Sequence, residues 1–257
     1  MFINNFDPVA ISLLSLDIRW YSLAYIFGIL IGWFYIGKFL INDTYLKKNF
    51  DDLISYIIIG IIVGGRLGYV IFYNFSYYSK NFFEIFYIWE GGMSFHGGLG
   101  GVIIVTYIFC KRRKINPFFF LDCISVAAPI GIFFGRIANF INSELYGKVT
   151  YVPWGVIFEK VDYVPRHPSQ LYEAFLEGIL LFIILNVLIK FNFLNKRGVL
   201  SSLFLILYSI FRFLSEFFRE PDPQLGYIIL NFSMGQILSF FLLALGFIIL
   251  LKNEKKK

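Results

Sequence analysis

The chain has 257 residues, of which 58% are hydrophobic and only 16% are charged. Aromatic residues make up 21%, and the mean hydropathy is +0.70. An ordinary soluble domain has about 25% charged residues, and a globule of this size could not bury so much apolar surface. These values exclude a disordered chain, a nucleic-acid-binding module and a disulfide scaffold, and they predict a polytopic membrane protein.

The chain starts with an arm, residues 1–19, which lacks the basic start and the cleavage site of a signal peptide. We expect this arm to lie at the membrane interface. Most of the apolar runs that follow approach the roughly 20 residues that a helix needs to cross the bilayer, and each is apolar on all sides. The runs span residues 20–41, 53–73, 93–110, 118–140, 169–189, 199–218 and 228–251. They predict an all-α bundle of seven transmembrane helices in a single membrane domain, 1–257.

Positive charge is distributed unevenly between the two ends of these predicted helices. Of the 23 Lys and Arg residues, 14 fall on one side and six on the other. The 14 occur in the segments 38–48, 111–114, 190–197 and 252–257. By the positive-inside rule that side is cytoplasmic. We therefore expect the N-terminus outside, a short outer head segment over 142–168, and the C-terminus inside as a basic tail over 252–257. The basic residues act as topology signals and do not form a nucleic-acid patch.

Three basic residues remain, Arg66, Arg136 and Arg212, and all three fall inside predicted spans. An unpaired charge in the bilayer is costly, so each should face a polar cavity or a partner. Snorkelling or a structural ion pair would explain any one of them. The presence of three, together with the polar residues near them, favours a functional site.

The segment 135–147, with the sequence GRIANFINSELYG, closes the fourth predicted span on its outer side. Arg136 and Asn139 are three residues apart, so they share a helix face. A guanidinium fork with an amide beside it suits the oxygens of a phosphate group. The structural alternative is a helix end capped by an Asn, with Gly147 turning the chain, and the two interpretations are compatible.

A second polar group lies at residues 211–222. Arg212, Glu216 and Arg219 are spaced as i, i+4 and i+7, which predicts one polar stripe on an otherwise apolar helix that Pro221 ends. We expect an ion pair between Arg212 and Glu216. That pair would orient Arg212 toward a site.

A third group, WEGGMSFHGGLGG at residues 89–101, places His96 among six glycines. Glycines let backbones or a ligand approach closely, and a histidine at the outer mouth of a span is a candidate general base as well as a possible structural residue. His167 lies in a loop fixed by two prolines, where it is either structural or substrate-facing, and Ser169 can cap the next helix. All these groups fall near the outer side, which favours one active site.

Taken together, the segments GRIANFINSELYG, WEGGMSFHGGLGG, RHPSQLYE and FRFLSEFFREPDPQLG resemble those of the bacterial prolipoprotein diacylglyceryl transferases. The resemblance covers nearly the whole chain and implies a seven-helix enzyme of the bacterial plasma (inner) membrane. Such an enzyme moves the diacylglyceryl group of phosphatidylglycerol to the lipobox cysteine of a prolipoprotein signal peptide and releases glycerol 1-phosphate. The segment 148–164 is shorter here than in some relatives, which affects the shape of the outer head.

The resemblance also implies which residues act, and it implies neither a metal nor another cofactor. The expected catalytic residues are His96, Arg136, Arg212 and Tyr21. The expected head-group ligands are Arg136, Asn139, Glu144, Gly147, Arg212, Glu216 and Arg219.

The chemistry is compatible with these residues. A thiol has a pKa near 8.5, so a base is needed to form the thiolate at neutral pH. His96 is the first candidate for this base, and Tyr21 or a glutamate paired with an arginine is the alternative. A transporter for an anionic solute is the main rival function, although the two halves of the chain show no internal repeat. A purely structural scaffold would leave three buried arginines without a purpose.

We expect His96→Ala to reduce transfer strongly while leaving folding and membrane insertion intact, because the substitution removes the candidate base. The measurement is thioether formation by purified protein with labelled phosphatidylglycerol and a lipobox peptide at pH 7. Near-normal transfer would mean that Tyr21 or a carboxylate acts as the base.

Overall fold

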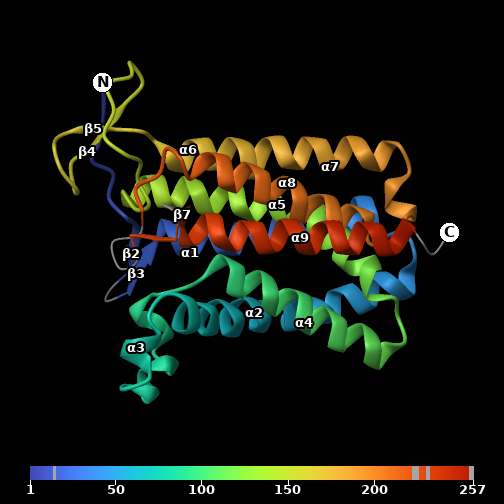
Figure 1. Cartoon of the computed structure of the whole chain (residues 1–257). Helices are drawn as coiled ribbons and strands as arrows, with labels where there is room; N and C mark the ends of the chain where they lie inside the picture. Colours follow the sequence, from blue (N-terminus) through green and yellow to red (C-terminus); the bar gives the residue numbers. More distant parts are fainter. Residues whose placement is uncertain (14–15, 222–225, 230–231, 255–257) are drawn as a thin grey trace. The chain divides into compact units, whose positions relative to one another are not determined.

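The computed structural model of the chain describes all residues except 14–15, 222–225, 230–231 and 255–257. The chain is mostly helical (Figure 1). Its α-helices are α1 (Trp20–Tyr35), α2 (Thr44–Phe72), α3 (Phe75–Tyr78), α4 (Phe95–Arg113), α5 (Pro117–Asn142), α6 (Ser169–Glu173), α7 (Leu181–Lys190), α8 (Val199–Ser215) and α9 (Met234–Glu254). A π-helical segment, η4 (Ala174–Leu180), joins α6 to α7 into one continuous helix, and another, η1 (Ile36–Leu40), extends α1.

Within the described residues, five helices are long and apolar enough to cross a membrane. They are Trp20–Leu40, Thr44–Phe72, Pro117–Asn142, Ser169–Lys190 and Met234–Asn253. A shorter apolar helix, Val199–Ser215, accompanies them. Each of the seven predicted spans overlaps a helix. The third predicted span, 93–110, coincides with most of α4.

Short strands accompany the helices, which an all-helical prediction did not include. They are β1 (Phe2–Asn4), β2 (Val9–Leu13), β3 (Leu16–Arg19), β4 (Val156–Phe158), β5 (Pro165–Arg166), β6 (Tyr227–Ile229) and β7 (Phe232–Ser233). In the predicted arm, β2 and β3 form an antiparallel hairpin. In the head segment, β4 pairs in parallel with β1 and antiparallel with β5.

The chain forms two compact units, which are described separately. The described residues of 1–36, 122–222 and 226–257 form unit 1, and Gly37–Leu121 forms unit 2. Every residue of the predicted site except His96 lies in unit 1.

In unit 2, α2 and α4 lie side by side (Figure 1), and glycines on both helices allow the close approach. A Cβ at Gly64 would lie 2.4 Å from the carbonyl oxygen of Gly97, and one at Gly101 would lie 2.0 Å from that of Gly60. Backbones this close leave no room for a side chain. Much of the glycine-rich sequence around His96 is therefore explained by helix packing.

Arg66, one of the three arginines within spans, has a structural role in unit 2. Its guanidinium donates to the carbonyl oxygens of Ile85, Glu84 and Gly91, with 2.9 Å from Nε to Ile85 O and 2.7 Å from Nη2 to Glu84 O. The guanidinium also lies 5.0 Å from the ring centroid of Tyr78. Arg66 thus anchors the loop that follows α3, and the prediction that it would find a partner is confirmed.

In unit 1, the buried carboxylate of Asp122, on α5, caps the start of α8. It accepts the backbone N–H of Gly198 at 2.6 Å and that of Ser201 at 2.8 Å, and it also accepts the Ser201 hydroxyl. A carboxylate at a helix N-terminus satisfies free N–H groups and favours the helix dipole. This contact fixes the position of the N-terminus of α8 relative to Asp122 on α5.

Two predicted helix boundaries near the site are wrong. The sixth helix ends at Ser215, well before Pro221, so Glu216 and Arg219 lie in the turn and bridge that follow α8. The last helix begins at Met234 and not at Ile228, because Ile228 and Ile229 belong to β6 and Phe232 and Ser233 to β7. Residues 230–231 of the predicted span lie outside the described residues.

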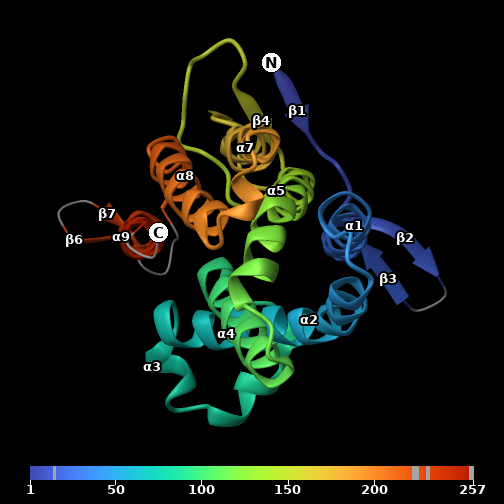
Figure 2. The ribbon, with the colours of Figure 1, turned by 90° about the vertical axis from the view of Figure 1, so that its right-hand side faces the viewer.

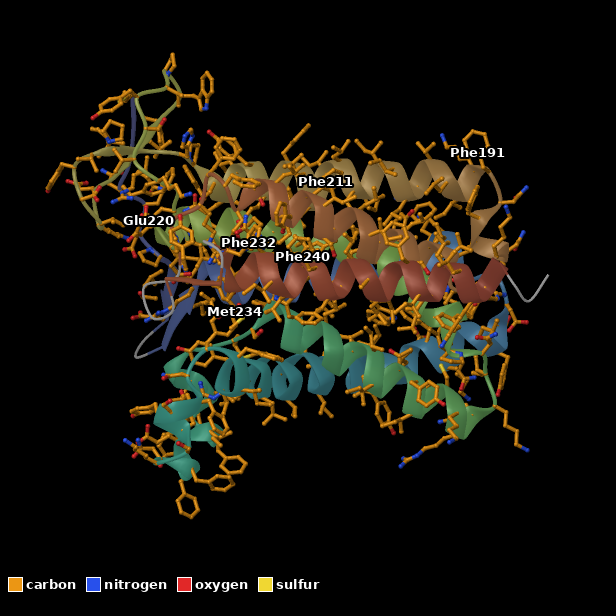
Figure 3. The ribbon with its side chains drawn as sticks, viewed as in Figure 1. Phe191, Phe211, Glu220, Phe232, Met234 and Phe240 are labelled. Atoms are coloured by element: carbon orange, nitrogen blue, oxygen red, sulfur yellow. The ribbon has the colours of Figure 1, made fainter. Side chains whose placement is uncertain are left out.

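A capping box explains why the last helix starts where it does. The Ser233 backbone N–H donates to the Gln236 side chain, and the Gln236 backbone N–H donates to Ser233 Oγ. Phe232 then packs against Phe213 of α8 and Phe240 of α9. The ribbons of α8 and α9 lie side by side in Figure 2, and Phe232 and Phe240 are labelled in Figure 3.

The α2–α4 packing generates a test with neighbouring glycines. We expect Gly101→Ala to destabilise the protein by about 1–3 kcal/mol, because the new methyl group overlaps the backbone of Gly60. Gly100→Ala is the matched control, because nothing lies within 4 Å of its Cβ position and alanine favours a helix by up to about 1 kcal/mol. The measurement is the midpoint of thermal unfolding in detergent. Equal effects of the two substitutions would contradict the packing.

Candidate active site

A buried cluster of three arginines and three glutamates lies in unit 1. Its members are Arg136 on α5, Glu173 on α6, Glu177 on η4, Arg212 on α8, and Glu216 and Arg219 just after α8. We call these six residues the charge cluster. Glutamates and arginines are almost never this buried unless they are paired. The carboxylates and guanidiniums of the cluster balance in formal charge.

Arg136 bridges two fully buried carboxylates. Its Nη1 lies 2.9 Å from Glu173 Oε2, and its Nη2 lies 2.9 Å from Glu177 Oε2. Glu173 and Glu177 are four residues apart and would repel each other without the guanidinium between them. Gly178 allows this approach, because a Cβ there would lie 2.7 Å from Phe133 Cβ on α5.

Arg212 is held from two sides. Its Nη2 lies 2.7 Å from Glu216 Oε2, which confirms the predicted ion pair, and its Nη1 bonds Glu173 Oε1. Glu216 is itself fixed: it accepts the Ser233 hydroxyl at 2.9 Å and packs against Gly235, where a Cβ would lie 3.1 Å from the carboxylate. The ion pair with Glu216 therefore ties Arg212 to the N-terminal turn of α9.

Arg219 joins the cluster through both its side chain and its backbone. Its Nη1 lies 3.9 Å from Glu173 Oε1, and its backbone forms a bridge with Gly147. A Cβ at Gly147 would lie 2.3 Å from the carbonyl oxygen of His167 and 2.7 Å from that of Phe218. Gly147 is therefore the point where three chain segments meet, and its role in the structure is steric.

The turn after α5 is strained and held by polar side chains. Ser143 and Leu145 adopt positive φ angles of 59° and 54°, which non-glycine residues rarely do. Ser169 Oγ donates to the Leu145 carbonyl at 2.9 Å, and the Gln170 amide donates to the Glu144 carbonyl. The expectation that Ser169 caps α6 is therefore wrong, because its hydroxyl holds this turn instead.

The remaining predicted head-group residues lie near this turn. Asn139 is buried, and its amide donates to Glu144 Oε2 at 3.2 Å. The Tyr21 hydroxyl lies 3.4 Å from that of Tyr25, one turn further along α1. Unit 1 thus contains Tyr21, the segment 135–147 and the charge cluster.

His96 belongs to unit 2, where it is the second residue of α4. Ser94 starts this helix, since its hydroxyl accepts the backbone N–H of Gly97. The ring of His96 meets that of Phe95 edge to face, with 5.7 Å between centroids. The role of His96 as a base stays a prediction.

His167 packs in the outer head segment of unit 1. Its Nδ1 lies 3.1 Å from the Tyr172 hydroxyl, which also accepts the Trp154 N–H at 2.8 Å. Burial lowers the pKa of His167, so its ring is neutral at neutral pH. These contacts favour the structural interpretation of His167.

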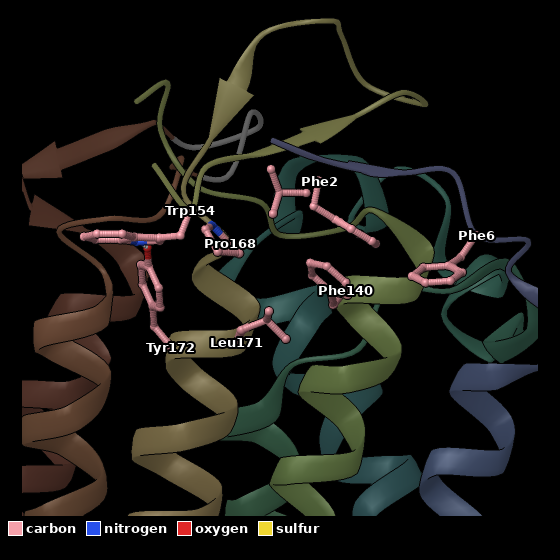
Figure 4. Close-up of a pocket in the computed structure, with 8 residues that line it drawn as sticks. Phe2, Phe6, Phe140, Trp154, Pro168, Leu171 and Tyr172 are labelled. Carbon is pink, nitrogen blue, oxygen red and sulfur yellow. Dashed lines mark hydrogen bonds between the residues drawn. The ribbon is translucent and has the colours of Figure 1, made fainter. Parts of the chain in front are cut away.

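An apolar hollow of about 490 Å³ opens beside Tyr172 and Trp154 (Figure 4). Phe2 and Phe6 of the N-terminal arm line it opposite the end of α5, and the Phe2 ring stacks on Phe140 with 6.3 Å between centroids. The arm and the end of α5 are thereby packed together through aromatic side chains.

Sequence reasoning missed Glu173 and Glu177 as members of the site. The signal was available: two acidic residues, one helical turn apart, in an apolar run that was itself predicted to cross the membrane. The rule that singled out the buried arginines applies equally to buried carboxylates.

The cluster provides guanidinium groups that are fixed by carboxylates and largely buried. Such groups can stabilise an anion or the negative charge that develops on a leaving group. Among the residues that the structure describes, no three His, Cys, Asp or Glu side chains are grouped so that they could hold a metal ion.

Comparison with known proteins identifies the family. The family model of prolipoprotein diacylglyceryl transferase matches residues 8–252. A phosphatidylglycerol–prolipoprotein diacylglyceryl transferase of Rickettsia bellii (strain OSU 85-389) is 53% identical over 253 residues, covering 97% of this chain and 96% of the relative. The enzymes with the same name from Rickettsia typhi and Rickettsia felis are 49% and 50% identical, covering 100% and 98% of this chain and the same shares of their own lengths. The chain belongs to the prolipoprotein diacylglyceryl transferase family.

Proposed function

We propose that the chain transfers the diacylglyceryl group of phosphatidylglycerol to the lipobox cysteine of prolipoproteins in the bacterial inner membrane. The product is a thioether, and glycerol 1-phosphate is released. The supporting observation is that full-length relatives near 50% identity are named phosphatidylglycerol–prolipoprotein diacylglyceryl transferases. The rival function, transport of an anionic solute, is set aside because the family is one of transferases.

We also propose seven membrane spans, with the N-terminus outside and the C-terminus in the cytoplasm. Within unit 1, α5 and α8 run in one direction while α1, α6–α7 and α9 run in the other (Figure 1). This alternation is the one expected if the first, fourth, fifth, sixth and seventh spans each cross the bilayer once. The basic segments at 111–114 and 190–197 support the orientation.

The charge cluster is the proposed site for the lipid phosphate. In the transfer, the thiolate sulfur attacks the glyceryl carbon that is bonded to phosphate oxygen, the carbon–oxygen bond breaks, and its electron pair leaves with the phosphate. Arg136 and Arg212 would stabilise the charge that builds up there, which in a dry site can contribute several kcal/mol. The observation that carries this proposal is that Arg212 is buried, that the Arg136 side chain is only 11% exposed, and that carboxylates already hold both guanidiniums in place.

The other predicted residues have supporting roles in this proposal. His96 would take the thiol proton, with Tyr21 or a carboxylate of the charge cluster as the alternative base. Asn139 would hydrogen-bond the head group from the last turns of α5, and Tyr21 would do so from α1. Glu144 would position the Asn139 amide, to which it is already bonded.

We expect Arg136→Lys to lose most of its transfer activity although the charge is kept. A lysine ammonium cannot bridge Glu173 and Glu177 with two nitrogens in one plane, nor can it grip a phosphate in a bidentate way. Arg113→Lys is the matched control, because Arg113 forms an exposed pair with Asp52. The measurement is the transfer rate per amount of membrane-inserted protein. Near-normal activity of the Arg136 variant would show that a point charge is sufficient.

A double-mutant cycle tests whether Glu216 acts through Arg212. Glu216→Gln keeps the shape and one acceptor, so it should cost less activity than Arg212→Gln, which removes the guanidinium. The double variant should be no worse than Arg212→Gln alone, because the pair acts as a unit. Transfer rates are measured for all four proteins at matched membrane levels. Fully additive losses would assign Glu216 a catalytic role of its own.

A further inference from the structure

The charge cluster poses a problem for a site that binds an anion. Its three arginines face three glutamates, so the cluster is formally neutral before any lipid arrives. The phosphate of phosphatidylglycerol carries one negative charge. Arg136 directs Nη1 at Glu173 and Nη2 at Glu177, and Arg212 directs Nη1 at Glu173 and Nη2 at Glu216. A phosphate that is to take a bidentate position on these paired nitrogens must therefore displace a carboxylate.

Two of the three glutamates are firmly held. Glu216 has a 2.7 Å contact with Arg212, accepts the Ser233 hydroxyl at 2.9 Å and packs directly against Gly235. Glu173 forms an ion pair with Arg136 through Oε2, at 2.9 Å, and hydrogen-bonds Arg212 through Oε1. Releasing Glu173 would break contacts with two arginines, and releasing Glu216 would break contacts with Arg212 and Ser233.

Glu177 is held by one short contact. Its Oε2 lies 2.9 Å from Arg136 Nη2, whereas its Oε1 lies 3.9 Å from Arg212 Nη1 and 3.5 Å from Ser215 Oγ, at or beyond the limit of a hydrogen bond. It is also repelled by Glu173, four residues earlier on the same helix. Its place in the π-helical segment Ala174–Leu180 adds a local irregularity of the kind that often marks functional sites.

From this geometry we propose that Glu177 is an exchangeable counter-ion: it neutralises Arg136 and Arg212 in the empty site and yields its place to the lipid phosphate. Glu173 is instead a positioning residue that keeps the arginines together throughout. This assignment rests on the proposed phosphate site. It predicts opposite effects for two glutamates that lie one helical turn apart.

The test compares Glu177→Gln with Glu173→Gln in the transfer assay, with phosphatidylglycerol titrated in mixed micelles at a fixed concentration of lipobox peptide. Glu177→Gln removes the competing charge, so the half-saturating lipid fraction should fall by about three- to tenfold, which corresponds to about 0.7–1.4 kcal/mol. Glu173→Gln releases Arg136 and Arg212, so the half-saturating fraction should rise and kcat should fall.

Asp122→Asn is the matched control for loss of a buried carboxylate. It should lower the thermal midpoint, because Asp122 caps α8, and leave the half-saturating fraction unchanged. Should Glu177→Gln fail to fold, Glu177→Asp replaces it. The shorter side chain lengthens the contact with Arg136 and should lower the half-saturating fraction by a smaller factor.

Two results would overturn the exchange. One is a half-saturating lipid fraction that rises in Glu177→Gln as it does in Glu173→Gln. The other is a half-saturating lipid fraction in Glu177→Gln that equals the wild-type value. A failure of the phosphate site itself gives a different result, because Arg212→Gln would then leave the half-saturating fraction at the wild-type value.

Discussion

Three arginines buried among apolar helices require three buried carboxylates, and the arrangement of unit 1 follows from that requirement. Desolvating a guanidinium is expensive, and only close, well-oriented carboxylates compensate for it. The cluster draws these carboxylates from α6, η4 and the turn after α8, while the arginines come from α5, α8 and that same turn. The helices must therefore pack so that all six side chains meet. Gly178 and Gly235 are the places where the backbone makes room for them.

A cluster of this kind has its guanidiniums oriented before the substrate arrives. Side chains already held in one geometry do not have to reorganise when charge develops, which is the basis of electrostatic catalysis in a dry site. The strained turn at Ser143 and Leu145 is held by Ser169 and Gln170, which lie on α6, the helix that also carries Glu173 and continues into η4. The same helix therefore supports both the turn and the cluster.

Much of this could be predicted from the sequence, and the failures have definite causes. The helices were predictable because apolar runs of about 20 residues have few alternatives in a bilayer, and the Arg212–Glu216 pair was predictable from its i, i+4 spacing. The end of α8 at Ser215 was not, because Glu216 is held by tertiary contacts with Ser233 and α9. Strand β6 was mistaken for helix because its residues are as apolar as those of α9. Glu173 and Glu177 were missed because attention went to buried cations alone.

The Asp122 cap has a consequence for how the cluster keeps its dimensions. On α5, Arg136 lies fourteen positions after Asp122. Arg212 likewise lies fourteen positions after Gly198, and the stretch from Val199 to Arg212 belongs to α8. The two helices run in the same direction from this shared anchor, each rising about 21 Å to its arginine. The distance from the Asp122 contact to the arginine is therefore the same along both helices. Removing a single residue from either helix between the anchor and the arginine would shift the guanidinium by about 1.5 Å along the helix and rotate it by about 100° about the axis. The number of residues in these two stretches is therefore as important for the cluster as the identity of its charged residues.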